Sequence, residues 1–151
     1  MEALNRDKTI MVLNRIMECE LVGVIRYTHY SLLVSGYNGD PVADWLRAQA
    51  DEGLKHARRA GKLLSLLGGH PAPTLLPIQG AYERDIGVIL RESLELENEA
   101  CAAYRELLVL SKGRSVFIED YARQLISAEG AHAAQVERRL HAPRAAAPHV
   151  A

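Results

Sequence analysis

The chain has 151 residues, enough for one domain with a sizeable apolar core. Eighteen basic and nineteen acidic residues leave a net charge of -1, which argues against a chain-wide surface for nucleic acid or anionic membrane. The N-terminal segment has no apolar run of signal-peptide or transmembrane length, so no membrane partner is expected and the cytoplasm is the expected compartment. Cys19 and Cys101 lack the spacing of a disulfide framework or a zinc site, and we expect reduced thiols.

Capping residues and glycine stops mark the first two predicted helices. Asp7 can cap a helix that runs to about residue 34, where Gly36 supplies the C-terminal stop. A second helix follows Asp40 and Pro41, which place an N-cap before a proline at the first helical position, and it runs to about Leu67. The short link between them predicts an antiparallel hairpin.

A proline-containing segment precedes the second pair of helices. Residues 70–80 contain three prolines and no helical period, so they are expected to form an extended connection that crosses the molecule. A third helix runs from about Tyr82 to Ser111, and Ser115 can cap a fourth that ends near Leu140. Two hairpins with one long link predict an all-α, up-down-down-up four-helix bundle over residues 1–141, followed by a disordered, Pro- and Ala-rich tail at 142–151.

A glutamate lies on the apolar stripe of both the first and the third helix, with a tyrosine two turns later. The pairs are Glu20 with Tyr27 and Glu97 with Tyr104. An unpaired carboxylate on such a stripe would cost several kcal/mol, so each glutamate requires a buried partner, and a metal ion is one candidate. The tyrosines are expected to be core aromatics with satisfied hydroxyl groups.

The two hairpins are related by an internal repeat. This repeat predicts a pseudo-twofold axis, with four glutamates at one level of the bundle. A shift of 77 residues superposes Glu20 on Glu97, Tyr27 on Tyr104 and Glu52 on Glu129.

The spacing of carboxylates and histidines is typical of a two-metal site in a helical bundle. Such a site takes one glutamate from each of two helices and a Glu-x-x-His pair from each of the other two. The fourth helix supplies Glu129 and His132, whereas on the second helix Gly53 stands three residues before His56 and Glu52 stands four before it. Gly53 costs about 1 kcal/mol relative to alanine, which suggests a tight contact, a side chain or a water at this place. The predicted metal-ligating and catalytic residues are Glu20, Glu52, His56, Glu97, Glu129 and His132.

Residues 10–140 resemble the ferritin-like superfamily, nearest to its bacterioferritin branch. The resemblance implies a di-iron centre that oxidises Fe(II) with O2 or H2O2 for iron storage or detoxification. It also implies that Glu20 and Glu97 are terminal ligands, Glu52 and Glu129 bridging ligands, and His56 and His132 one nitrogen ligand for each ion. The similar segments are Leu13-Asn14, Glu20-Leu21-Val22 and Tyr27 on the first helix, Asp51-Glu52 and Lys55-His56-Ala57 on the second, and Glu129 with His132 on the fourth.

Three departures from that family modify these expectations. The helix B spacing of the family is Glu-x-x-His, so the extra residue places a bridging Glu52 in doubt. Gly53 and Leu54 follow Glu52 where bacterioferritins carry their haem-ligating methionine, and no haem is expected. The tail is too short to replace the fifth helix of cage-forming relatives, so a homo-oligomer, at least a dimer, is expected, and the choice between a dimer and a 24-subunit shell stays open.

Three readings of the site remain open from the sequence. The first is a ferroxidase-type enzyme with two Fe ions, or with Mn or a mixed pair. The second is a small non-cage carrier that holds metal without turnover or storage. The third is a structural bundle whose polar core is an ion-pair network.

Overall fold

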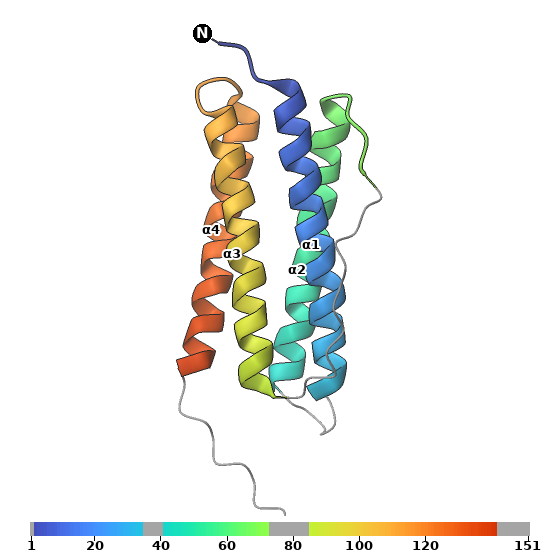
Figure 1. Cartoon of the computed structure of the whole chain (residues 1–151), viewed down its shortest axis with the longest axis vertical. Coiled ribbons are helices and arrows are strands. Elements are labelled where there is room, and N and C mark those ends of the chain that lie inside the picture. Colours follow the sequence, from blue (N-terminus) through green and yellow to red (C-terminus); the bar gives the residue numbers. More distant parts are fainter. Residues whose placement is uncertain (1, 35–40, 73–84, 142–151) are drawn as a thin grey trace, which may run out of the picture.

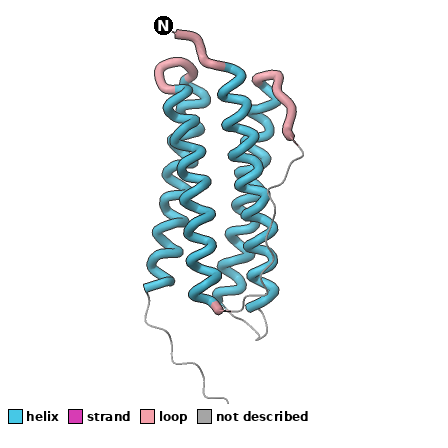
Figure 2. Tube along the Cα trace, in the orientation of Figure 1, coloured by secondary structure: helices cyan, strands magenta, loops and turns pink. Residues whose placement is uncertain are grey.

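The computed structural model describes residues 2–34, 41–72 and 85–141, and these form a bundle of four long helices (Figure 1). Helices α1 and α4 run in one direction and helices α2 and α3 in the other (Figure 1). The described residues contain no strand (Figure 2). The predicted all-α, up-down-down-up fold is therefore confirmed. The helices are α1 (Arg6–Val34), α2 (Pro41–Leu66), α3 (Ile86–Ser111) and α4 (Val116–His141).

Side-chain caps define where three of the helices begin. The prediction of Asp7 as the first cap is wrong, because the Asn5 side chain accepts the hydrogen bond from the Lys8 amide over 3.1 Å. Asp85 caps α3 by accepting from the Val88 amide over 3.1 Å, so α3 begins after this residue. Ser115 caps α4 as predicted. The predicted features at Gly36, Asp40 and Tyr82, most of the 70–80 connection and the 142–151 tail lie outside the described residues.

A glycine in the left-handed conformation follows the end of helix α2. Gly68 has φ +74°, and the Gly69 amide donates to the carbonyl of Leu64 over 3.0 Å. The guanidinium group of Arg6 donates to the carbonyls of Leu67 and Gly68 at 2.6 and 3.2 Å, respectively. These contacts tie the start of α1 to the end of α2 and fix the relative height of the two helices.

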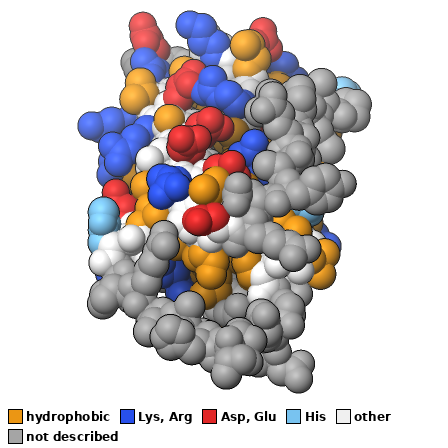
Figure 3. Space-filling model, turned by 60° about the horizontal axis from the view of Figure 1, so that its bottom comes forward, with side chains coloured by type: hydrophobic (Ala, Val, Ile, Leu, Met, Phe, Trp, Pro, Cys, Tyr) orange, Lys and Arg blue, Asp and Glu red, His pale blue; other side chains and the backbone are white. Residues whose placement is uncertain are grey.

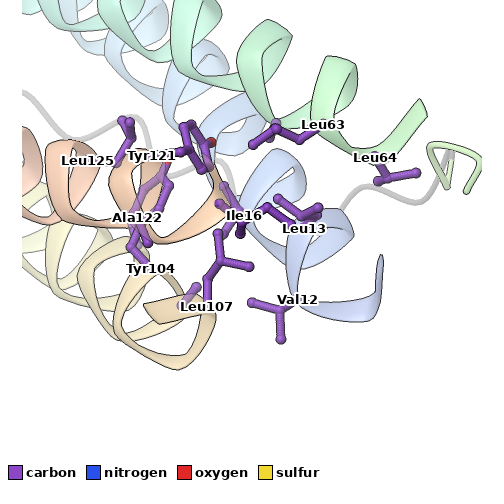
Figure 4. Packing of buried hydrophobic residues seen from close by; sticks show 14 residues of the cluster. Val12, Leu13, Ile16, Leu63, Leu64, Tyr104, Leu107, Tyr121, Ala122 and Leu125 are labelled. Carbon is purple, nitrogen blue, oxygen red and sulfur yellow. The ribbon is translucent and has the colours of Figure 1, made fainter. Parts of the chain in front are cut away.

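The apolar core is divided into two clusters by a layer of buried polar residues. The larger cluster, near the α3–α4 link, takes residues from all four helices, as the labelled side chains in Figure 4 show. The smaller cluster lies toward the other end of the bundle. Along α1, α2 and α3, the polar ligand residues of the intervening layer fall between the residues of the two clusters. The larger cluster includes Leu13, Ile16, Leu64, Tyr104, Leu107 and Leu125, and the smaller one includes Val22, Tyr27, Leu46 and Ile89.

The surface of the bundle carries both signs of charge. Figure 3 shows basic and acidic side chains interspersed on one face rather than gathered into a single-sign patch. None of the helices in the described ranges is long and apolar enough to span a bilayer.

Candidate metal centre

The polar layer brings together five of the six predicted ligands. They are buried or nearly so, and Glu129 is only 2% exposed. Their ligand atoms form two groups, within each of which all atoms lie within 4.8 Å of one another. Each group contains two carboxylates and one imidazole, and both groups contain Glu129. The first group is Glu20, His56 and Glu129, and the second is Glu97, Glu129 and His132.

Glu129 lies between the two histidines. Its Oε1 is 2.9 Å from Nδ1 of His56, and its Oε2 is 3.7 Å from Nδ1 of His132. The two imidazole rings are nearly parallel, with centroids 6.2 Å apart and an interplanar angle of 18°. Glu20 adds a second carboxylate to His56, with Oε1 at 3.4 Å from Nδ1. A carboxylate whose two oxygens face two different histidines has the geometry that a bridge between two ions requires.

Two tyrosines hold the outer carboxylates across the bundle. Tyr27 on α1 donates to Oε1 of Glu97 over 2.5 Å, and Tyr104 on α3 donates to Oε1 of Glu20 over 2.8 Å. Burial is the main cause that raises the pKa of both hydroxyl groups, so they remain protonated donors. Both hydroxyl groups are satisfied, as expected from the sequence, but their partners are the candidate ligands of the opposite helix.

The buried carboxylates have strongly divergent pKa values in the metal-free protein. Burial raises the pKa of Glu20 to about 8. Burial and the neighbouring Glu129 raise the pKa of Glu97 to about 10. Burial also acts on Glu129, but contacts with His132 and His56 outweigh it and lower the pKa of that carboxyl. Burial opposes the charge on His56, yet contacts with Glu129 and Glu20 raise its pKa to about 9. One charged carboxylate therefore lies among groups that retain their protons near neutral pH.

A small cavity of about 20 Å³ lies at the centre of these residues. Besides the five ligands, small side chains contribute to its wall, including Gly23, Gly53, Ala100 and Cys19. The volume suits one water molecule or ion of similar size. Carboxylate oxygens and imidazole nitrogens are ligands that iron, manganese and zinc accept, and the two ligand groups offer donors for two such ions.

Glu52 is the predicted ligand that the structure does not bring into either group of the described residues. Its side chain is 42% exposed, with Oε1 at 3.3 Å from Nζ of Lys55. Oε2 is 3.6 Å from Nε2 of His56, the ring nitrogen that does not face Glu129. Glu52 therefore lies on the solvent side of His56.

Gly53 takes the place on α2 that Glu129 takes on α4. The shift of 77 residues fits α1 and α3, where the buried Glu20 and Glu97 correspond. On α2 and α4 the pattern of burial fits a shift of 76 residues, which pairs His56 with His132 and Gly53 with Glu129. A methyl group on Gly53 would lie 3.3 Å from both the carbonyl oxygen of Glu20 and a Val24 methyl group. The structure therefore shows a tight helix contact at Gly53, in which the Val24 side chain takes part.

The repeat of 77 residues did not predict this change of register. The signal was present in the separation of the two histidines, which is one residue shorter than that of Glu20 and Glu97. The links between the helices of each hairpin can absorb one residue without changing the bundle, so the repeat need not keep one offset throughout.

The family model for the ferritin-like domain matches residues 10–145. No sequence among the curated proteins matches the chain. The chain is similar in structure to a ferritin-like, diiron-carboxylate protein of Bacillus anthracis str. Ames, with a TM-score of 0.83 and 20% identity over 92% of this chain and 99% of that one.

Two bacterioferritins are also similar in structure. That of Desulfovibrio desulfuricans, which has a diiron site, gives a TM-score of 0.80 and 21% identity over 89% of this chain and 79% of that one. The bacterioferritin of Rhodobacter capsulatus, with a metal-free dinuclear site and haem iron, gives a TM-score of 0.78 and 23% identity over 89% of this chain and 84% of that one. At this identity the solved structures support the fold, whereas the family model covers most of the sequence. The chain belongs to the family of ferritin-like domains.

Proposed function

We propose that the chain binds two iron ions in the polar layer and oxidises Fe(II) with O2 or H2O2. The observation that carries this proposal is the arrangement of two ligand groups that share Glu129 across one small buried cavity. The diiron sites of the structurally similar proteins support it.

Each ligand in this proposal has a distinct position. Glu20 and Glu97 are terminal ligands on α1 and α3, and each is oriented by a tyrosine hydroxyl group of the other helix. His56 and His132 supply one nitrogen to each ion through the Nδ1 atoms that face Glu129. Glu129 would serve as a ligand of both ions, and α2 offers no matching carboxylate at Gly53. The negative charge of the carboxylates favours the ferric product over ferrous substrate.

The metal-free cluster must release protons when iron binds. Glu20, Glu97 and His56 retain protons near neutral pH, and all three must lose them to act as ligands. Two tyrosine hydroxyl groups and two apolar clusters enclose the layer and limit access of bulk water. The chain thus provides negative charge and a small buried cavity, while iron supplies the electrons that reduce the oxidant.

We further propose iron alone, without haem, as the bound group, with manganese or a mixed pair as the alternative metal. Gly53 and Leu54 follow Glu52 where a haem-ligating methionine is expected. The free thiols of Cys19 and Cys101 are consistent with a reducing cytoplasm, where ferrous iron is available. A homo-oligomer, at least a dimer, is the proposed assembly.

A carrier that holds metal without turnover is the second candidate. The observation that favours it is Gly53, because only one carboxylate lies between the two histidines. A site with one bridge holds its two ions less rigidly than a site with two.

An aerobic titration of the metal-free protein with Fe(II) tests these alternatives. We expect O2 consumption on addition of Fe(II) and about two irons retained per chain after desalting, as the ligand set predicts. Replacement of the exposed Glu137 by Gln, on the same helix as Glu129, is the matched control and leaves both values unchanged.

The other outcomes separate the alternatives. Retention of two ions without O2 consumption would support the carrier. Uptake far beyond two irons per chain would require a closed cage and would support storage. Absence of saturable binding would overturn the proposal and leave the polar layer as an ion-pair network.

A further inference from the structure

We propose that Glu52 is a positioning residue for His56 rather than a ligand of the metal ions. This inference rests on the proposed function of the polar layer as a two-metal site. Glu52 contacts the outer nitrogen of the imidazole and keeps the inner nitrogen directed at the cavity.

The two nitrogens of His56 face opposite environments. Nδ1 points to the buried carboxylates, at 2.9 Å from Glu129 and 3.4 Å from Glu20. Nε2 points to the solvent side, where Oε2 of Glu52 lies 3.6 Å away. Metal-ligating histidines usually donate their second ring N–H to a carboxylate or carbonyl, which fixes both the tautomer and the ring orientation. Glu52 occupies the position of that second partner.

The surroundings of Glu52 hold its carboxylate in this place. Glu52 precedes His56 by four residues, so the two side chains lie on one face of α2. Nζ of Lys55 is 3.3 Å from the other carboxylate oxygen and leaves Oε2 for the imidazole. The distance of 3.6 Å is a charge contact rather than a hydrogen bond. A small rotation of the half-exposed Glu52 side chain would bring Oε2 within hydrogen-bond distance of Nε2.

The opposite helix has no equivalent of this carboxylate. Ala128 stands four residues before His132, where α2 has Glu52 before His56. Under this proposal the two ions depend differently on their supporting residues. The ion held by His56 requires Glu52, and the ion held by His132 does not.

Zinc binding to the metal-free protein and to Glu52 variants tests the proposal. Zinc uses the same carboxylate and imidazole donors and is diamagnetic, which permits nuclear magnetic resonance of 15N-labelled histidines. In Glu52→Ala we expect a 10- to 100-fold loss of affinity for one of two zinc ions and none for the other. In Glu52→Gln, whose amide oxygen still accepts a hydrogen bond, we expect most of the affinity to remain.

The resonances of His56 give a readout that a purely structural role would not change. In the zinc-loaded protein we expect zinc on Nδ1 and a proton on Nε2 that exchanges slowly with water. In Glu52→Ala that proton exchanges faster. The matched control is Asp44→Ala, which removes another exposed acid of α2 that pairs with a basic residue three positions later.

Three results would overturn the proposal. Unchanged affinity for both ions in Glu52→Ala would leave Glu52 without a role. Coordination of zinc by Nε2 of His56, or complete loss of one ion in both Glu52 variants, would make Glu52 part of the metal shell. Failure of the unmodified chain to bind two zinc ions is distinguishable from these, because it would overturn the proposed function and this inference with it.

Discussion

The polar segments of α2 and α4 each carry one histidine of the polar layer, but they place different residues beside it. On α4, Glu129 reaches both histidines from the centre of the layer. On α2, the corresponding position is Gly53, and the nearest carboxylate, Glu52, lies one residue away on the solvent side of His56. The two hairpins therefore share a fold and a pair of histidines but not a pair of bridging carboxylates.

The difference shows that repeated helices can diverge at one residue without loss of the bundle. Glycine at position 53 allows the backbone of α1 to approach α2, and this close packing replaces the contacts that a larger side chain would make. A single carboxylate then has to serve both ligand groups. The centre is consequently predicted to depend on α4 much more than on α2.

The largest expected effect is that of Glu129→Gln. Because both ligand groups contain Glu129, this change is expected to abolish retention of both metal ions, whereas His132→Ala removes one. Metal analysis after desalting measures the number of ions per chain, with circular dichroism to verify the fold. Retention of one ion in Glu129→Gln would show that Glu129 serves only one position and would remove the contrast with Gly53.

A pH series on the metal-free protein tests the difference in protonation between Glu129 and the other ligands of the polar layer. The raised pKa values of Glu20, Glu97 and His56 mean that the folded protein retains protons that the unfolded chain releases as pH rises. Stability is therefore expected to fall from about pH 5 to pH 9, by at most about 1.4 kcal/mol per pH unit for each retained proton. The lowered pKa of Glu129 acts in the opposite sense and contributes stability that is lost on acidification below pH 4.5.

Urea unfolding at several pH values measures this slope. Glu97→Gln is the matched variant, because glutamine imitates the protonated carboxyl and flattens the slope. Stability that rises between pH 5 and pH 8 would contradict the assignment of protons to the cluster. Metal affinity is expected to rise over the same range, since the ligands must lose these protons first.

Most of the fold could be predicted because the local signals agreed with one another. Proline at position 41 and serine at position 115 mark the starts of α2 and α4, and the structure follows them. The prediction of the first cap was wrong because Asn5 and Asp7 are both residue types that cap helices, and the sequence alone does not select between them. Glu20 and Glu97 could be identified because carboxylates on an apolar stripe are costly and therefore informative.

The remaining features depend on contacts between helices. The direction in which Glu52 points is set by the rotation of α2 against α1, which depends on the approach at Gly53. The crossed hydrogen bonds from Tyr27 to Glu97 and from Tyr104 to Glu20 require antiparallel alignment at one height. In the sequence, the tyrosine follows the glutamate by seven residues on each helix. This spacing agrees with the crossed hydrogen bonds, but it does not specify which glutamate each tyrosine contacts.

The smallest expected effect concerns two glycines, one in each of the compared segments. Gly130 on α4 has open space where a Cβ atom would lie, so Gly130→Ala is expected to stabilise the protein by about 1 kcal/mol through helix propensity. In Gly53→Ala the same gain is opposed by contacts at 3.3 Å with the Glu20 carbonyl oxygen and Val24, one of which is backbone. Since the backbone cannot move aside cheaply, a net loss of about 1 kcal/mol is expected. Urea unfolding of the two metal-free variants measures the difference, and equal stabilisation by both would show that Gly53 is not needed for close packing of α1 on α2.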